Sequence, residues 1–379
     1  MASEHRTIVI KIGTSSLTEH DGSMSPAKVR EIVRQVVELK RRGDDIVIVS
    51  SGAIAAGFRL LGHTQRPKAV AAKQAAAAVG QGLLMEEYTR GLYEHGYIGA
   101  QLLLTRGDFT DKRRYDNIFN ALGELLRSGA VPIINENDTT SIEELRFGDN
   151  DTLSAQVAAM IHADLLVLLT DIDGLYTSDP RKDPQAEHID IVEAVTPAIE
   201  ALGGGAASEL SSGGMRSKIT AAALATASGV PVFICSSACE EAVIGGADRA
   251  VRGTYFTASK DHLKTRLQWM AFYTEGKGRL YIDSGAERAL VKSGKSLLPS
   301  GIVAIEGEFS KGDVVDVYSS ENRFLGRGIS GYDRQALAAI KGRHSEGRQT
   351  VAVHRSNWVG SDKIKLIRDE EPKEDAANE

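Results

Sequence analysis

Short apolar runs alternate with amphipathic segments between residues 7 and 234. The continuous apolar run Thr7–Ile12 is typical of a buried strand. After it, Ser25 as N-cap and Pro26 at the first helical position predict a helix that Gly43 ends. Further strands are predicted at 45–49, 98–104, 131–134, 165–169 and 231–234. Further helices are predicted at 69–93, 115–128, 152–162 and 215–228.

This alternation predicts an α/β fold, in which a mostly parallel open sheet is covered by helices on both faces. In open sheets of this kind, ligands bind beyond the carboxyl ends of the strands. Polar clusters follow four of the predicted strands, and we expect them to share one crevice. These clusters are Lys11–Ser16, Ser50–Ala53, Asn135–Asp138 and Thr170–Gly174.

The pattern changes near residue 275, where we place a domain boundary. A chain of 379 residues is longer than one hydrophobic core usually serves, so two domains are expected. The second part has short strands and many glycine turns, which predict a compact β-rich module. Its predicted strands are 279–283, 301–303, 314–318 and 351–354. The charged segment 366–379 contains too few apolar residues to pack, and we expect it to be disordered.

Composition and charge exclude several classes of protein. The net charge of −6 argues against a protein that coats nucleic acid. The N-terminus lacks the apolar core of a signal peptide, and no apolar run approaches the length of a membrane span, so we expect a soluble, cytoplasmic protein. Cys235 and Cys239 have no second pair of metal ligands nearby, and we expect them to be reduced thiols.

The familiar nucleotide-binding loops are absent. Gly294-Lys295-Ser296 has the end of a Walker motif, but Ala289 occupies the position of its first glycine. No GxGxxG follows the first strand. Lys11 instead ends that strand and is followed by Gly13 and small hydroxyl residues, which suit a phosphate group. A solvated side chain would explain a lysine at this position equally well.

Two further segments favour the phosphate interpretation. Residues 211–218 form a Ser/Gly loop that runs into a helix carrying Arg216 and Lys218. Backbone amides and the helix dipole would attract an anion there, although an ordinary surface loop remains the alternative. Residues 135–138 and 148–151 contain many carboxylates and amides, which can bind a metal, an ammonium group or lysines. Asp151 also fits as the N-cap of the next helix. Together these groups predict phosphoryl transfer, which depends on positioning and charge stabilisation.

Several stretches of sequence resemble the amino acid kinase family, and most closely its glutamate 5-kinase branch. The similarity runs in order from residue 7 to about residue 260. SSGAIAAG and GDND distinguish this branch from carbamate kinases, aspartokinases and acetylglutamate kinases. The C-terminal stretch SLLPSGIVAIEGEFSKGDVVDV resembles a PUA domain. The other matching stretches are VIKIGTSSLT, KQAAAAVGQ, VPIINENDT, LLTDIDGLYTSDP and GGMRSKITAA.

The resemblance implies transfer of a phosphoryl group from ATP to the side-chain carboxylate of L-glutamate, with Mg²⁺, as the first step of proline biosynthesis. It implies that Lys11 and Lys218 stabilise the transferred group and that Asp151 positions them. It assigns no metal ligand. The implied glutamate contacts are Ser51, Asp138, Asn150 and Asp149. The implied nucleotide contacts are Lys11, Gly13, Thr170, Asp171, Ser212, Gly213, Gly214, Met215, Arg216, Ser217 and Lys218.

The implied organisation is a catalytic domain at 1–258, a linker at 259–278, a PUA-like domain at 279–365 and the acidic tail. The family further suggests inhibition by proline, a homodimer or homotetramer, and functional coupling to glutamyl phosphate reductase. In the nucleotide loop Ser211-Ser212 replaces Gly-Thr of the family pattern, and Arg146 stands where some relatives have Lys.

An RNA-binding or RNA-modifying protein is the alternative from another class, because PUA domains often bind RNA. Residues 279–360 contain 12 Lys/Arg against 9 Asp/Glu. This is a weak basic excess beside the dense stripe that nucleic-acid binding requires.

Overall fold

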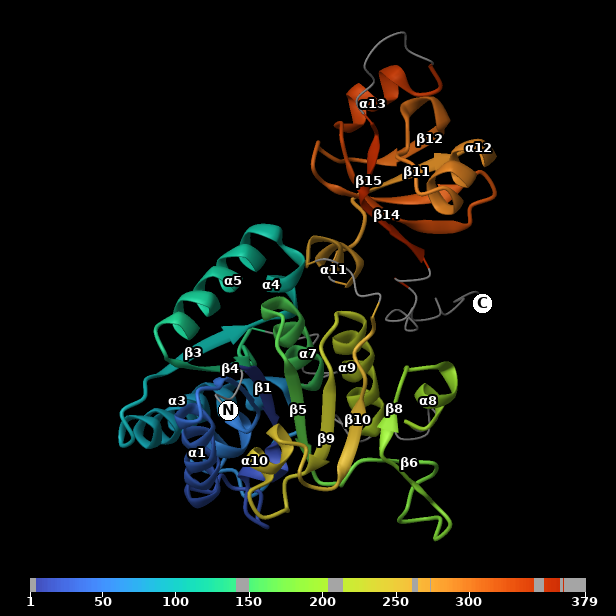
Figure 1. Cartoon of the computed structure of the whole chain (residues 1–379). Coiled ribbons are helices and arrows are strands. Elements are labelled where there is room, and N and C mark those ends of the chain that lie inside the picture. The colour runs from blue at the N-terminus through green and yellow to red at the C-terminus, as the bar shows by residue number, and fades with distance from the viewer. Residues whose placement is uncertain are drawn as a thin grey trace, which may run out of the picture. The chain divides into compact units, whose positions relative to one another are not determined.

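The computed structural model describes residues 5–140, 150–203, 214–260, 265–272, 274–343, 351–361 and 364. The chain divides into two compact units, residues 1–262 and 263–379, and each is described by itself. The first unit is drawn from blue to yellow in Figure 1, and the second in orange and red.

An eight-stranded sheet forms the centre of the first unit, in the order β3-β4-β2-β1-β5-β9-β10-β8. The strands β3, β4, β2, β1, β5 and β9 are parallel, as predicted, whereas β10 runs antiparallel to β9. Their bounds are β1 Thr7–Ile12, β2 Asp45–Ser50, β3 Gly99–Leu104, β4 Val131–Glu136, β5 Leu165–Thr170, β8 Ile191–Val192, β9 Val232–Ser236 and β10 Gly253–Phe256. A separate hairpin pairs β6 Leu175–Tyr176 with β7 His188–Ile189.

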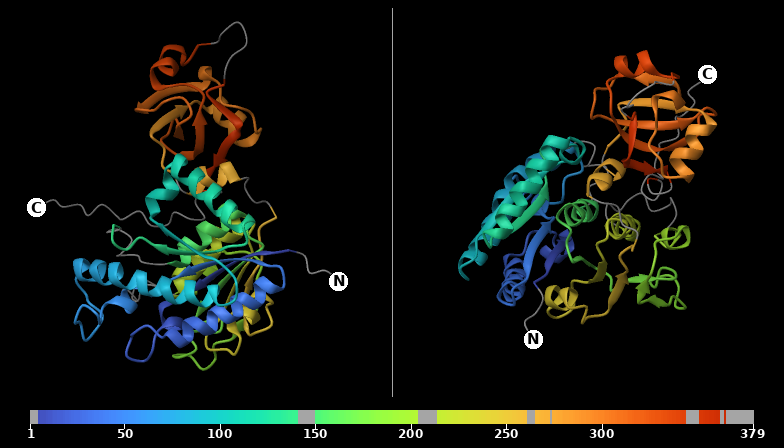
Figure 2. Two further views of the ribbon diagram at one scale, coloured as in Figure 1. Left: turned by 90° about the vertical axis from the view of Figure 1, so that its left-hand side faces the viewer. Right: turned by 45° about the horizontal axis from the view of Figure 1, so that its top comes forward.

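Helices cover both faces of this sheet (Figure 2). Because side chains alternate along a strand, Ile8, Ile10 and Ile12 of β1 pack with residues of α1, α3 and α10 in one core. Val9 and Lys11 therefore face the opposite layer, which contains α7 and α9. The helix bounds are α1 Pro26–Arg41, α2 Ala53–Gly57, α3 Val70–Tyr93, α4 Arg106–Thr110, α5 Lys112–Arg127, α7 Asn150–Ile161, α8 Pro197–Ala201, α9 Met215–Ala227 and α10 Ala242–Ala247. A short 3-10 helix, Thr14–Leu17, follows β1.

Local signals account for the helices that were predicted. The hydroxyl of Ser25 accepts a hydrogen bond from the amide of Lys28 at 3.4 Å, and Pro26 starts α1. Gly43 has φ +96° after the helix, which suits the residue that ends it.

The interpretation of Asp151 as an N-cap was wrong: α7 begins at Asn150, and Asp151 lies in its first turn. Its carboxylate binds lysine side chains instead of capping the helix.

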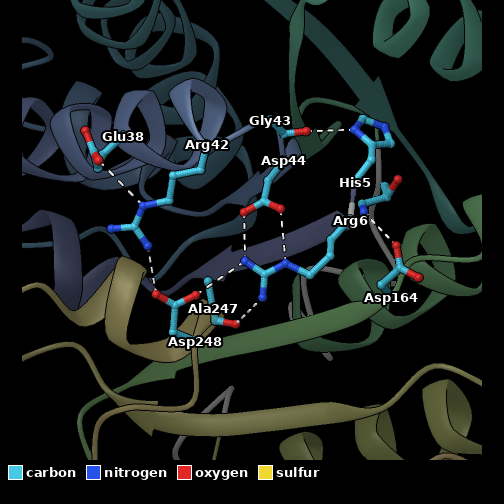
Figure 3. Close-up of polar contacts among 10 residues, drawn as sticks. His5, Arg6, Glu38, Arg42, Gly43, Asp44, Asp164, Ala247 and Asp248 are labelled. Carbon is cyan, nitrogen blue, oxygen red and sulfur yellow. Dashed lines mark hydrogen bonds and ion pairs between the residues drawn. The ribbon is translucent and has the colours of Figure 1, made fainter. Parts of the chain in front are cut away.

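A polar cluster joins three elements at the edge of the sheet where β1 begins (Figure 3). Arg6 donates two hydrogen bonds to the carboxylate of Asp44, at 3.0 and 2.8 Å, and a third to the carbonyl oxygen of Ala247 at 3.2 Å. Arg42 pairs with Asp248 at 2.8 Å. Since Asp44 is 2% exposed, the cluster fastens the start of β1 to the ends of α1 and α10.

The second unit contains a five-stranded sheet, in the order β12-β11-β13-β14-β15. Arg327 of β14 is fully buried, and its Nε donates to Asp316 at 2.7 Å. The same guanidinium donates to the carbonyl oxygen of Thr274, which attaches the segment after α11 to the sheet. The bounds are β11 Gly278–Ile282, β12 Ile302–Gly307, β13 Val314–Ser319, β14 Phe324–Ser330, β15 Val353–Gly360, α11 Thr265–Phe272, α12 Ser284–Glu287, α13 Arg334–Ile340, a π-helical turn Arg288–Lys292 and a 3-10 turn Pro299–Gly301.

Within the described part of the chain, no helix is both long enough and apolar enough to cross a bilayer. Both cysteines are free thiols, and burial raises the pKa of Cys235 to about 12. Cys235 lies in the core beside α10, so it acts as a small apolar side chain.

The helices α2 and α3 approach each other at two glycines. A Cβ on Gly57 would lie 2.0 Å from the carbonyl oxygen of Ala76, and one on Gly80 would lie 1.9 Å from that of Ala53. Both neighbours are backbone atoms that cannot turn away. The sequence SSGAIAAG therefore needs its last glycine to bring α2, and the turn before it, against α3.

We expect Gly80→Ala to lower the free energy of unfolding by about 2–3 kcal/mol, because the methyl group forces the two backbones apart. Gly82→Ala on the same helix is the matched control, since no atom lies within 4 Å of its Cβ position. It should stabilise the protein by up to about 1 kcal/mol through helix propensity. Urea unfolding measures both, and equal stabilities would contradict the close approach.

Candidate active site

The ends of the central strands lie side by side, as expected for one crevice. Ile12 at the end of β1 is aligned with Ser50 of β2 and with Leu169 of β5. Thr170 lies beside Ser236 of β9. The polar residues after β1, β2 and β5 therefore meet at one edge of the sheet, opposite the edge with the Arg6 cluster.

Two lysines share one carboxylate at this edge. Lys11 Nζ forms an ion pair with Asp151 Oδ1, and Lys218 Nζ lies 3.1 Å from Asp151 Oδ2. The exposed fractions are 6% for Lys11, 5% for Lys218 and 0% for Asp151. The structure thus brings together the three residues that the sequence assigned to catalysis, from β1, α7 and α9.

Two neighbouring helices position Asp151 and Lys218. α7 and α9 lie side by side on the sheet (Figures 1 and 2), with Asp151 in the first turn of α7 and Lys218 near the start of α9. The positive end of the α7 dipole favours the carboxylate of Asp151. Ser217 donates to Asp151 Oδ2 at 2.9 Å, so this carboxylate oxygen accepts from two side chains of α9.

The three side chains of this cluster, two ammonium groups and one carboxylate, together carry a net charge of +1. Removing charges from water is costly unless they are paired and hydrogen-bonded, which Asp151 provides for both lysines. The two ammonium groups, together with the start of α9, favour an anion in the crevice. This arrangement suits a group such as phosphate.

A second network lies between β2, β4 and α7. The side-chain amide nitrogen of Asn150 lies 2.9 Å from Ser51 Oγ and 2.8 Å from Asn135 Oδ1. Asn135 in turn donates to Gln81 of α3 at 2.9 Å. Among the described residues, none donates to the buried Oδ1 of Asn150. That oxygen can accept from a ligand that enters the crevice.

Sequence reasoning missed two residues that support this network from α3. Gln81 orients Asn135, and the fully buried hydroxyl of Tyr88 lies 3.0 Å from Ser50 Oγ. Ser50 Oγ donates to the carbonyl oxygen of Ser51, so it accepts from Tyr88. Gln81 lies in the stretch KQAAAAVGQ, but nothing in the local pattern separates it from a surface residue.

Asp138 is half-buried after β4. Burial raises the pKa of its carboxyl to about 6, while the charge of Arg66 acts in the opposite direction. Of the implied glutamate contacts, Ser51 and Asn150 are joined by a hydrogen bond, and Asp138 lies separately on the turn after β4. Asp149 lies outside the described residues.

The residues assigned to the nucleotide are described in part. A Cβ on Gly13 would lie 3.8 Å from Lys11 Nζ, so this turn is close to the cluster. Thr170 donates to Asp171 Oδ1 at 3.0 Å. Gly214 precedes α9 as its N-cap, Met215 and Ser217 are partly buried, and Arg216 is exposed. Ser212 and Gly213 lie outside the described residues, as do Ser211 and Arg146.

Comparison with known proteins gives the family. The amino acid kinase family model matches residues 6–236, and the PUA domain model matches residues 278–349. The chain belongs to the amino acid kinase family. Among full-length relatives, this amino acid kinase is 52% identical over 367 residues to a glutamate 5-kinase of Neisseria meningitidis serogroup A, covering 96% of this chain and 99% of that one.

A glutamate 5-kinase of Streptococcus pneumoniae is 50% identical to this amino acid kinase over 357 residues, covering 94% of this chain and 96% of its own. A solved carbamate kinase from Giardia lamblia has a TM-score of 0.48 and 16% identity, covering 68% of this chain and 100% of that one. The relatives from Neisseria meningitidis and Streptococcus pneumoniae place this member of the family with the glutamate 5-kinases along nearly its whole length.

We expect Asp151→Asn to lower the free energy of unfolding by about 3–5 kcal/mol, because it leaves two buried ammonium groups without their carboxylate. Ser217→Ala removes one hydrogen bond to the same carboxylate and should cost about 1 kcal/mol. Chemical denaturation compares the two variants with the parent protein. A loss in Asp151→Asn no larger than that in Ser217→Ala would mean that the ion pairs are not maintained in solution.

Proposed function

We propose that the first unit transfers the γ-phosphoryl group of ATP to the side-chain carboxylate of L-glutamate, which gives ADP and L-glutamyl 5-phosphate, the first step of proline biosynthesis. The observation that carries this proposal is the buried Lys11–Asp151–Lys218 cluster at the carboxyl edge of a parallel sheet. The glutamate 5-kinases that are similar over nearly the whole chain support the choice of substrate.

The chemistry requires charge stabilisation more than proton transfer. A glutamate carboxylate is ionised at neutral pH, so its oxygen attacks the γ-phosphorus without a general base. The bond from phosphorus to the β–γ bridging oxygen breaks, and ADP leaves. Repulsion between the anionic nucleophile and the anionic phosphate opposes the approach. Lys11 and Lys218 offset it as positive charges that are already in place.

Asp151 acts as a positioning residue in this scheme. It touches the ammonium groups of both lysines and fixes the distance between them. Without it the two like charges would repel each other and move apart. Because Asp151 already holds both lysines in place, they need little rearrangement as the phosphoryl group moves.

The amide network is the proposed glutamate site. Ser51 and the turn at Gly52, which has φ +108°, offer a hydroxyl and backbone amides to a carboxylate. Asn150 Oδ1 and the carboxylate of Asp138 would accept hydrogen bonds from the α-ammonium group. Asp149 stays in this set as a proposal from the family pattern.

The proposed nucleotide contacts are Gly13, Thr170, Asp171 and the start of α9, with Ser212–Lys218 before and within that helix. Mg²⁺ is proposed as part of the substrate, bound to the phosphates of ATP, where it would neutralise charge. Both oxygens of Asp151 are engaged by lysines, and the described residues contain no group of three His, Cys, Asp or Glu side chains that fits a metal. Mg²⁺ would therefore be held mainly by the phosphates and water, with one or two carboxylates at most from the described residues.

Other properties remain proposals from the family resemblance. They are feedback inhibition by proline, a dimeric or tetrameric assembly, coupling to glutamyl phosphate reductase and a cytoplasmic location. We also propose the domain extents 1–258, 259–278 and 279–365. RNA binding by the PUA-like domain is the alternative role, and no contact among the described residues of the second unit favours it.

The substrate assignment predicts a strong preference among acceptors. With ATP and Mg²⁺, trapping of the acyl phosphate by hydroxylamine should give hydroxamate with L-glutamate. Aspartate is one methylene too short, and N-acetylglutamate lacks the ammonium group, so both should give far less.

Lys218→Ala should lower hydroxamate formation on the order of 100-fold. Lys182→Ala is the matched control, because its side chain is 85% exposed. Equal rates with all three acceptors would refute the substrate, and equal rates in both variants would refute the role of Lys218.

The raised pKa of Asp138 predicts how glutamate binding depends on pH. Above pH 6 its carboxyl is ionised and can bind the ammonium group, and below pH 6 it becomes neutral. The KM for glutamate should therefore rise about tenfold between pH 7 and pH 5, since one pKa unit corresponds to a tenfold change in the ionised fraction. Asp138→Asn should have a high KM at every pH. If the KM of that variant still rises toward pH 5, another group is responsible.

A further inference from the structure

A short hairpin follows the strand that carries the proposed nucleotide residues. β5 ends at Thr170, residues 171–174 form a connection, and β6 then pairs with β7. The first end of this connection is fixed to the main sheet, because the carbonyl oxygen of Thr170 accepts from the amide of Ser237 at 2.7 Å. Its other end is fixed by a residue from a distant part of the chain.

That residue is Thr254, which lies on β10 and is fully buried. Its hydroxyl accepts from the amide of Leu175 at 2.7 Å and donates to the carbonyl oxygen of Ile189 at 2.6 Å. One side chain thus joins both strands of the hairpin to β10 of the main sheet. A hydroxyl suits this position because it can accept and donate at once.

The connection is also closely packed where it meets the hairpin. Gly174 has φ +140°, and a Cβ there would lie 2.4 Å from His188 Nε2 and 2.6 Å from Thr254 Oγ1. His188 Nε2 lies 3.1 Å from the carbonyl oxygen of Asp173, and the side chain of His188 is only 7% exposed. Asp171 remains exposed between the two fixed ends.

From these contacts we infer that Thr254 is a positioning residue for nucleotide binding: it holds the 171–174 connection in place before the nucleotide arrives. The inference rests on the proposed nucleotide role of Thr170 and Asp171. A connection that is already ordered loses little conformational freedom on binding, which raises affinity. Thr254 itself touches no nucleotide in this scheme and acts through Leu175 and Ile189.

The first test uses the unmodified protein. Hydrogen exchange should show the amide of Leu175 protected in the absence of nucleotide, because Thr254 accepts from it. Adding ADP should change the protection of Leu175 little. Rapid exchange that slows only when ADP binds would overturn the inference, since the connection would then be ordered by the ligand.

The second test compares variants by calorimetric titration with ADP and by the KM for glutamate. Thr254→Val removes both hydrogen bonds, and we expect ADP affinity to fall about fivefold to tenfold, in line with one or two lost hydrogen bonds. Thr254→Ser keeps the hydroxyl and should restore most of the affinity. The KM for glutamate should change less than twofold, since the amide network does not include Thr254.

Thr274→Val is the matched control, because Thr274 is also a buried threonine whose hydroxyl donates to a backbone carbonyl, in the second unit. It should lose stability without losing ADP affinity. Thr170→Val separates the two claims. If Thr170→Val weakens ADP binding and Thr254→Val does not, the inference is wrong and the nucleotide role stands. If neither weakens it, the nucleotide role fails, and the inference fails with it.

Discussion

Two buried ammonium groups bind one buried carboxylate at the carboxyl edge of the central sheet, and most of the site depends on that arrangement. Lys11 and Lys218 repel each other, and the carboxylate of Asp151 holds them together by binding one on each oxygen. The cluster needs a rigid frame, because a small displacement would expose or separate the charges. Its two ammonium groups can also attract an anionic phosphoryl group.

The frame follows from the topology. Parallel strands bring their carboxyl ends to one edge, so β1 delivers Lys11 beside the turns that follow β2 and β5. α7 and α9 begin at that same edge and contribute Asp151 and Lys218. At the opposite edge, the Arg6 cluster fastens the start of β1. The sheet therefore fixes the cluster through strands and helices, whereas the proposed substrate contacts lie on turns.

The sequence predicted the elements whose signals are local. β1 was found from one continuous apolar run, and α1 from its cap, its proline and its closing glycine. Elements that depend on distant partners were missed, including the antiparallel strand β10 and the hairpin β6–β7. Asp151 fitted a helix cap when only its neighbours in sequence were considered, and the family resemblance alone connected it with the lysines, because Lys11 of β1 and Lys218 of α9 lie far from it along the chain.

The site shows the same difference between features with a local sequence signal and features that depend on distant residues. Lys11 alone was an ordinary lysine at the end of a strand, and the family resemblance supplied its expected role. Two lysines share one carboxylate only in the folded protein, because the three residues are far apart in sequence. Gln81, Tyr88 and Thr254 could not be predicted, because their roles lie in single hydrogen bonds to backbone or side chains of other elements.

The most direct measurement of the central claim is a crystal structure with ADP, Mg²⁺, aluminium fluoride and L-glutamate, in which the fluoride imitates the phosphoryl group in transfer. The account predicts that the Nζ atoms of both Lys11 and Lys218 lie about 3 Å from fluoride ligands, at hydrogen-bonding distance. Asp151 should still bind both ammonium groups. A complex in which either lysine contacts only Asp151, with the fluoride held by other residues, would contradict it.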